Sequence, residues 1–292
     1  MNMVAGPHEF YRHSGKFGVH GPLLAVLAAC LLGYPLGIAY AYLIDWIPFV
    51  YLNFFITLGY GAAFGLLCAF LLRFARVRNT FVAGLTGLAA GACAYYFSWN
   101  GYVHMLMNDP PLLADFGGLS RLVTVMYTVG SWGIGSSGTP VTGPLLGLVW
   151  AVEAIMIIGA CTALAYSAVA LVPYCESCRS WLSEEEKIDT LDHFDSPQHI
   201  EQLKAGSLAP LDLARPRDPA ASRFARLTVR HSPQCADFCT LSVDNVSVSV
   251  DKEGKSKEKS EAIISNLQVP KSLLDRLTKA DPAAPQGAPA TG

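Results

Sequence analysis

Four cysteines in the carboxy-terminal part of the chain have spacings that could bind a metal ion. Cys175 and Cys178 form a Cys-x-x-Cys pair, and Cys235 and Cys239 form a second close pair further along the chain. The thiolate is the form of cysteine that ligates metals, and a short-spaced pair places two thiolates on one compact turn. Two such turns can complete a tetrahedron of sulfur ligands around Zn²⁺. The sequence therefore predicts a closed, structural zinc site that contributes to the folding of a small domain.

This arrangement resembles a zinc-ribbon module over about residues 174–250. Its two motifs are Cys175-Glu-Ser-Cys178 and Cys235-Ala-Asp-Phe-Cys239. The second pair has three intervening residues rather than two, and the two pairs are far apart for such a module. His231, four residues before Cys235, is therefore the substitute ligand for Cys239. The resemblance implies small antiparallel strands beside a four-coordinate zinc ion.

Two other roles remain open for these thiols. A redox pair would use Cys175 and Cys178 alone, although no βαβ pattern surrounds them as it does in thioredoxin-like dithiols. Ordinary buried thiols are the third interpretation. Attachment of haem is excluded, because position 179 is Arg where that motif requires His.

One carboxylate, Glu153, lies within an otherwise apolar stretch. An ionisable group in a membrane span is costly, so it indicates either a function or a structural hydrogen bond. Trp150 lies one turn earlier, and as an interfacial aromatic residue it would place Glu153 only about 5 Å deeper. The candidate partners are Asn53 and Thr57 in another apolar stretch, and Arg121. One interpretation is structural, namely an interfacial acid or a hydrogen bond with Asn53 that locks the bundle. The other interpretation is a pathway for protons or cations.

The distribution of charge indicates which elements position these residues. The chain has 292 residues, of which 52% are hydrophobic and 15% are charged. Residues 1–172 hold only 11 of the 44 Asp, Glu, Lys and Arg residues. Soluble domains contain about 25% charged residues, so the composition excludes a single soluble domain and predicts a membrane part followed by a water-soluble part. The net charge of −2 argues against a nucleic-acid partner.

Four stretches are long and apolar enough to cross a bilayer, whose hydrocarbon core requires about 20 apolar residues in a helix. The predicted spans are residues 23–43, 48–72, 81–99 and 144–171. Small-xxx-small spacings accompany all four, and such spacings let helix backbones approach closely. These pairs are Gly33 and Gly37, Gly61 and Gly65, Gly87 and Gly91, and Gly143 and Gly147. We expect them to be packing surfaces of a compact four-helix bundle or of its oligomer.

Basic residues predict the orientation of the spans. Arg73, Arg76 and Arg78 lie in the short connection between the second and third spans, and Arg12 and Lys16 precede the first span. Lys and Arg accumulate in the cytoplasmic loops of membrane proteins. The sequence therefore predicts a multi-pass protein of the cell membrane with both termini in the cytoplasm.

The predicted organisation has four parts. Residues 1–21 form an N-terminal cytosolic arm, residues 22–172 a four-transmembrane-helix bundle, residues 173–280 a small α+β zinc-ribbon-like cytosolic domain, and residues 281–292 a disordered tail. Within the membrane part, the apolar stretch 119–132 is predicted to be a helix on the outer surface, with a re-entrant element as the alternative.

Local signals predict the elements of the soluble part. Ser183-Glu-Glu-Glu186 is a capping box, which predicts a helix from near Glu184. A second helix should begin with Ser196 as its cap and Pro197 at its first position, and end at Gly206. The further predicted elements are a connector over 207–222, strands over 226–230, 241–250 and 261–269 with a bulge or turn at Asp244-Asn245, a charged turn over 251–259 and a short helix over 271–279.

Signatures of catalysis, such as a phosphate-binding Gly loop or H-E-x-x-H, are absent from the sequence. We therefore expect a non-catalytic membrane anchor or scaffold that presents the zinc-stabilised module to a protein partner or to a second copy. An oligomeric transporter or channel subunit that uses Glu153 is the alternative. A membrane-bound thiol redox protein that uses Cys175 and Cys178 is the second alternative. The lipid bilayer is a partner in each case.

Overall fold

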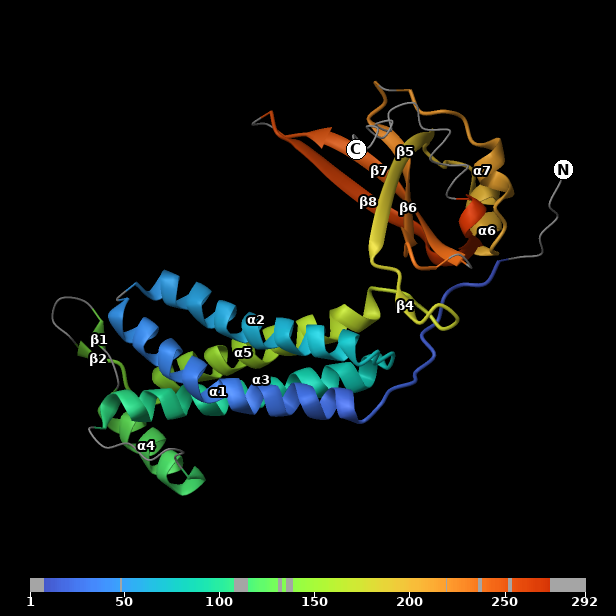
Figure 1. Cartoon of the computed structure of the whole chain (residues 1–292). Coiled ribbons are helices and arrows are strands. Elements are labelled where there is room, and N and C mark those ends of the chain that lie inside the picture. The colour runs from blue at the N-terminus through green and yellow to red at the C-terminus, as the bar shows by residue number, and fades with distance from the viewer. Residues whose placement is uncertain are drawn as a thin grey trace, which may run out of the picture. The chain divides into compact units, whose positions relative to one another are not determined.

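The structure is a computed structural model, which describes residues 8–47, 49–107, 115–130, 133–134, 139–218, 220–235, 238–251 and 254–273. The chain forms two compact units (Figure 1). Ser14–Leu171 is mainly helical, whereas Val172–Gly292 together with Met1–His13 is rich in strands. The predicted tail 281–292 lies outside the described residues, as does most of the helix predicted over 271–279, of which positions 271–273 are helical.

Four long helices dominate the first unit. They are α1 (His20–Trp46), α2 (Val50–Phe74), α3 (Thr80–Leu106) and α5 (Gly143–Ala170). All four are long and apolar enough to cross a membrane, in agreement with the predicted spans. Large apolar side chains on these helices point outward, and Leu31, Phe70 and Ile155 have 79%, 66% and 71% of their surface exposed. Such a surface suits lipid, because soluble proteins rarely expose large apolar patches.

Glycines mark the closest approaches between these helices. α1 packs mainly on α3, and α5 packs on α2 and α3. A Cβ at Gly61 would lie 2.7 Å from the backbone of Ile157, so a larger residue does not fit there without movement. The neighbours that an added Cβ would meet are Phe97 for Gly33 and Gly37, Ile157 and Leu164 for Gly61 and Gly65, and Thr162 and Ile158 for Gly87 and Gly91. The first three predicted pairs are therefore packing surfaces, whereas a Cβ at Gly143 in the fourth would meet nothing within 4 Å.

A shorter helix, α4 (Phe116–Val129), precedes a small hairpin of β1 (Gly133–Ile134) and β2 (Thr139–Pro140). Asp115 caps the first turn of α4 by accepting a hydrogen bond from the N–H of Gly118. Gly130, with a φ of 93°, ends the helix. The helix predicted over 119–132 is therefore confirmed for residues 119–129, whereas residues 131–132 lie outside the described residues. Its depth relative to a bilayer stays a prediction.

The second unit is built on a four-stranded antiparallel sheet with the order β5-β6-β7-β8. The strands are β5 (Glu184–Asp192), β6 (Arg223–His231), β7 (Phe238–Val250) and β8 (Ser256–Pro270). Two short helices, α6 (Pro197–Lys204) and α7 (Ala209–Leu213), connect β5 to β6. A small hairpin of β3 (Tyr174–Cys175) and β4 (Ser180–Trp181) precedes the sheet. The helix predicted after Ser196 is confirmed as α6, and the connector predicted over 207–222 contains α7.

One face of this sheet and the two short helices enclose the main core, to which α6 and α7 each contribute a leucine. The pairing of β7 with β8 shifts register between Leu241 and Asp244, and the extra residues lie on β8. The pairing of β7 with β6 is regular over the same residues, so Val243 and Val246, which are both fully buried, lie on opposite faces of the sheet. The irregularity predicted at Asp244-Asn245 is therefore present beside that position, but as a bulge of β8 and not of β7.

The helix predicted from Glu184 is wrong, since Glu184–Asp192 is strand β5. The capping box favours a helix locally, but cross-strand contacts stabilise the strand. Glu185 pairs with Arg230 of β6 at 2.6 Å, and Ile188, which is 3% exposed, packs in the core. Tertiary packing therefore overrides the local signal.

Residues 8–13 belong to the strand-rich unit although they precede α1 in the chain. Phe10 forms a β-bridge with Leu267 of β8. Backbone hydrogen bonds of 2.8 to 2.9 Å join His8 N to Gly206 O, Tyr11 N to Asn266 O and Gln268 N to Glu9 O. This short segment therefore extends the sheet on the free side of β8.

Candidate metal centre

Cys175 and Cys178 lie on the β3–β4 hairpin. Cys175 pairs with Ser180 across the hairpin, and Cys178 lies in the turn between the strands. Arg179 follows with a φ of 53°, a left-handed conformation that tightens the turn. The N–H of Cys178 donates to Sγ of Cys175 at 3.4 Å. The Cys-x-x-Cys spacing therefore forms a compact knuckle.

Cys235 reaches this knuckle from the connection between β6 and β7. Its N–H donates to the carbonyl oxygen of Ser232 at 3.0 Å, and Nζ of Lys271 donates to the carbonyl oxygen of Cys235 at 3.1 Å. Sγ of Cys235 lies 2.9 Å from Sγ of Cys178. The sulfur atoms of Cys175, Cys178 and Cys235 all lie within 4.8 Å of one another. Among the described residues, these three form the one such group of potential metal ligands.

A small hydrophobic cluster surrounds the three thiols. Cys175 and Cys235 are 0% and 1% exposed and pack with Leu182, while Cys178 is half-buried at the edge of the cluster. Burial raises the pKa of the Cys175 thiol, but hydrogen bonds from Ser177, the Cys178 N–H and the neighbouring thiols bring that pKa below its ordinary value. A lowered pKa favours the thiolate, which is the metal-binding form.

Neither predicted fourth ligand joins this group in the described part of the chain. Cys239 lies on β7 opposite Val269, and its Sγ faces the carbonyl oxygen of that residue at 3.6 Å inside the main core. His231 lies at the end of β6, where its ring nitrogens are 3.5 and 3.3 Å from carboxylate oxygens of Glu184 and Glu186. The assignment of Cys239 or His231 as a ligand is thus not supported by their positions. Residues 236–237, next to Cys235, lie outside the described residues.

Three thiolates at these separations can hold a metal ion that favours sulfur. A Zn–S bond is about 2.3 Å long, so two sulfur atoms on one tetrahedral zinc ion lie about 3.8 Å apart. The three sulfur atoms lie within 4.8 Å of one another, and Sγ of Cys178 and Sγ of Cys235 are 2.9 Å apart. Shifts of about 1 Å would bring the thiolates to the spacing that zinc requires. Sulfur ligands suit zinc, copper(I) and iron–sulfur centres, whereas Mg²⁺ and Ca²⁺ require oxygen ligands. The arrangement is therefore a candidate site for a thiophilic metal.

The carboxylate predicted to lie within the membrane has a partner that sequence analysis did not identify. Tyr40 of α1 donates a hydrogen bond to Oε1 of Glu153 at 2.7 Å, and the same hydroxyl lies 2.9 Å from Oγ1 of Thr57. Asn53 instead donates to the carbonyl oxygen of Ile44 at 3.4 Å. The structure therefore brings Glu153 and Thr57 together through Tyr40 and places Asn53 in a different contact. Tyr40 lies near the end of α1 and Thr57 near the start of α2, so matched depth is the signal that could have identified it.

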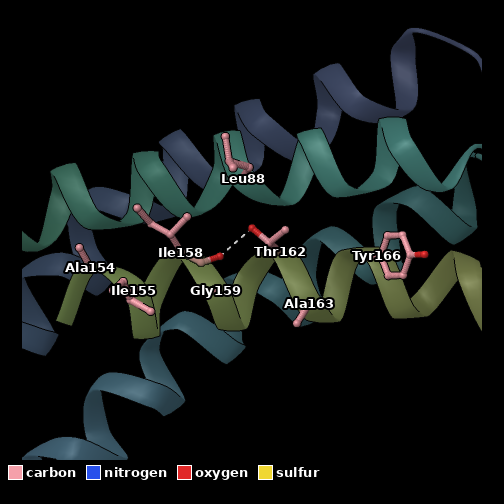
Figure 2. Close-up of a pocket in the computed structure, with 8 residues that line it drawn as sticks. All are labelled: Leu88, Ala154, Ile155, Ile158, Gly159, Thr162, Ala163 and Tyr166. Atoms are coloured by element: carbon pink, nitrogen blue, oxygen red, sulfur yellow. Dashed lines mark hydrogen bonds between the residues drawn. The ribbon is translucent and has the colours of Figure 1, made fainter. Parts of the chain in front are cut away.

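An apolar groove of about 610 Å³ runs between α3 and α5 (Figure 2). Leu88 of α3 lines one side, and residues of α5 from Ala154 to Tyr166 line the other. The hydroxyl of Thr162 donates to the carbonyl oxygen of Ile158 at 2.7 Å, so this polar group is satisfied within its own helix. The lining holds no acid, base and nucleophile in combination, and the groove is not a candidate catalytic site.

Comparison of the chain with models of protein families, with curated proteins and with solved structures finds no match. The fold and the site alone therefore define the class of protein. Four helices could span a membrane, and a small strand-rich unit with a cluster of three cysteines follows them.

Proposed function

We propose that the chain is an integral membrane anchor that presents a zinc-stabilised, non-catalytic module to a protein partner in the cytoplasm. The observation that carries the proposal is the clustering of Cys175, Cys178 and Cys235 directly after the last candidate span. A metal ion there would tie the β3–β4 hairpin to the β6–β7 connection, although Cys178 and Cys235 are 57 positions apart in the chain. Such a link stabilises a small domain, because the unfolded chain lacks a preformed site for the metal.

Both ends of the chain indicate on which side of the membrane the strand-rich unit lies. Residues 8–13 and the carboxy-terminal strands share one unit, so they would lie on the same side. An even number of spans between them requires the same arrangement. The connection between α2 and α3, with Arg73, Arg76 and Arg78, then falls on that side too. The positive-inside rule makes it the cytoplasmic side.

The β7–β8 hairpin favours a protein partner over nucleic acid. Beyond Arg223, the first residue of β6, β7 and β8 continue as a two-stranded arm. The exposed side chains of β8 on and beside this arm mix Lys257 and Lys259 with Glu258 and Glu261. A polyanion requires an excess of basic residues, whereas mixed charge suits recognition of another protein.

Metal analysis of the purified full-length protein tests the site. We expect about one zinc ion per chain by plasma mass spectrometry and its loss in Cys175→Ser, Cys178→Ser and Cys235→Ser. Cys30→Ser is the matched control, because this half-buried thiol lies on α1, outside the cysteine group, and its variant should keep the metal. Cys239→Ser should also keep the metal, because Cys239 does not belong to the group of three cysteines. A wild-type protein that carries no metal after purification without chelators overturns the proposal.

Crosslinking in intact membranes tests the presentation of the module. We expect a set of crosslinked proteins that is recovered with the wild type and with Cys30→Ser, and lost with Cys178→Ser. An unchanged set in Cys178→Ser protein that has lost its metal would show that the module does not recruit the partner.

The distance of 2.9 Å between Sγ of Cys178 and Sγ of Cys235 favours thiol redox chemistry as the second candidate function. Such a protein would be isolated without metal, and mild oxidation would join these two cysteines in a disulfide. Peptide mapping after oxidation, together with the metal analysis, separates the two functions.

A further inference from the structure

A chain of hydroxyl groups from two helices ends on the carboxyl group of Glu153 on a third. Tyr40 of α1 gives its one O–H to Oε1 of Glu153, at 2.7 Å. Because that proton is engaged, Thr57 of α2 is the donor in its 2.9 Å hydrogen bond with the Tyr40 oxygen. Tyr40 and Thr57 are 6% and 7% exposed, so the bundle shields both hydroxyl groups.

The neighbouring tyrosine hydroxyls have other acceptors. Tyr60 of α2 stacks on Tyr40, with 4.5 Å between ring centroids, and donates to a backbone carbonyl of α3 at 2.9 Å. Tyr95 of α3 donates to a backbone carbonyl of α5 at 3.4 Å. In the described structure, Tyr40 is therefore the hydroxyl that hydrogen-bonds to the carboxyl group.

No basic side chain in the described part of the chain neutralises Glu153. No nitrogen of Lys, Arg or His there lies within 4.0 Å of its carboxylate, and Arg121, the partner expected from the sequence, makes no ion pair with it. Tyr102 of α3, which interacts electrostatically with both Glu153 and Asp45, brings no positive charge. An ionised carboxylate is costly in an apolar bundle without a counter-ion. The site therefore calls for a positively charged ligand.

A proton is the ligand that this geometry accommodates. A metal cation would need several oxygen ligands directed at one point, but the oxygen atoms of Tyr40 and Thr57 are already hydrogen-bonded to each other. A proton needs one carboxylate oxygen and no cavity.

We propose that Glu153, positioned by Tyr40 and Thr57, is a proton-binding site within the helical bundle. A hydronium ion from the aqueous phase transfers its proton to the carboxylate and leaves a water molecule, and the reverse step releases the proton. The new O–H forms on Oε2, while Tyr40 continues to donate to Oε1. The groups come from α1, α2 and α5, so the bound proton affects contacts among three helices. This site is independent of the metal centre.

Infrared titration of the full-length protein in lipid nanodiscs tests the proposal over the range of about pH 4 to 9. We expect a carboxylic-acid C=O band that is lost in Glu153→Gln. The same band should stay in Glu201→Gln, which removes an exposed carboxylate on α6. In Tyr40→Phe the band should shift to higher wavenumber, because Oε1 loses its hydrogen bond.

Identical carboxylic-acid spectra for the wild type and Glu153→Gln at every pH overturn the proposal. If Glu153→Gln does not fold, Tyr40→Phe provides the test. An unshifted carboxylic-acid C=O band in Tyr40→Phe also overturns the proposal.

Discussion

Asn245 joins two segments of the strand-rich unit through a pair of hydrogen bonds. Its Nδ2 donates to the carbonyl oxygen of Phe194 at 2.9 Å, and its Oδ1 accepts from the N–H of Phe194 at 3.1 Å. Asn245 is 9% exposed, so an alanine there leaves two buried backbone groups without partners. We expect Asn245→Ala to lower the free energy of unfolding by about 3 kcal/mol in urea titrations. Ser249→Ala, an exposed change on the same strand, should alter it by less than about 0.5 kcal/mol. Equal stability of the two variants would contradict this account.

Asp244 gives the same unit a dependence on pH. Burial raises the pKa of its carboxyl group above the ordinary 3.8, although the positive charge of Arg226 partly offsets this. Because the folded state holds this proton more tightly than the unfolded chain does, the carboxyl contributes stability below pH 3.8 that is lost as the pH rises through its folded-state pKa. We therefore expect Asp244→Asn to gain stability relative to the wild type as the pH rises from 3.8 through the folded-state pKa of Asp244, by at most about 1 kcal/mol for a partly exposed group. Glu261→Gln, exposed on β8, controls for the loss of one negative charge in urea titrations. The prediction is refuted if the free energies of unfolding of Asp244→Asn and the wild type differ by the same amount at all pH values.

At the scale of single residues, the sequence identifies candidate functional side chains better than it identifies their partners. The close spacing of Cys175 and Cys178 predicts that they share a turn, because local spacing alone determines that geometry. Whether Cys239 can join the other cysteines as a metal ligand depends on the pairing of β7 with β8. This pairing places Cys239 opposite Val269 in the core. Glu153 is conspicuous in an apolar stretch, but its contact with Tyr40 depends on how α1 and α5 both pack on α2 and α3. Such long-range contacts have no local signature in the sequence.

The contact between α1 and α3 depends on glycine in both helices. A Cβ at Gly101 would meet the backbone of Gly37 and would lie 2.8 Å from the N atom of Ile38. Because backbone atoms cannot rotate away as a side chain can, the helices must separate to admit a methyl group. We expect Gly101→Ala to destabilise the purified protein in detergent by about 1–3 kcal/mol, measured by thermal unfolding.

Gly59→Ala on α2 is the matched control, because a Cβ at Gly59 would meet nothing within 4 Å. Alanine also favours a helix over glycine, so this variant should be as stable as the wild type or more so. If Gly59→Ala and Gly101→Ala lose equal stability, the close approach of α1 and α3 is not the cause.

At the scale of elements, the long apolar helices are predictable and the short elements are less so. The four spans can be predicted from length and hydropathy alone, because a membrane-spanning helix is apolar on all sides. Its prediction therefore does not depend on knowing which helices it packs against. Strand β5 is mistaken for a helix, since Ser183-Glu-Glu-Glu186 satisfies the rules for a helix start. The ion pair with Arg230 and the burial of Ile188 that favour the strand come from segments remote in sequence.

At the scale of the whole molecule, the docking of residues 8–13 on the strand-rich unit is the feature that the sequence does not predict. The segment is polar and short, and neither hydropathy nor period marks it as a strand. Its order depends on a sheet edge formed by residues more than 190 positions away, such as Leu267 opposite Phe10. The division of the chain into a membrane part and a soluble part is predictable from charge. That residues 8–13 belong to the strand-rich unit is not predictable in this way.

Gly206 is the position through which this docking can be tested. It has a φ of 82°, and a Cβ there would collide with the backbone of His8. Gly206→Ala should therefore release the segment, and the amides of Tyr11 and Gln268, which hydrogen-bond across this junction, should exchange with deuterium at least about tenfold faster. Gly254→Ala is the matched control, because Gly254 has a similar φ of 78° while its Cβ would meet nothing within 4 Å. Both variants carry the strain of a left-handed alanine, so only the loss of contact with His8 distinguishes them. Faster exchange at Tyr11 in both variants, or in neither, would show that Gly206 does not hold the segment in place.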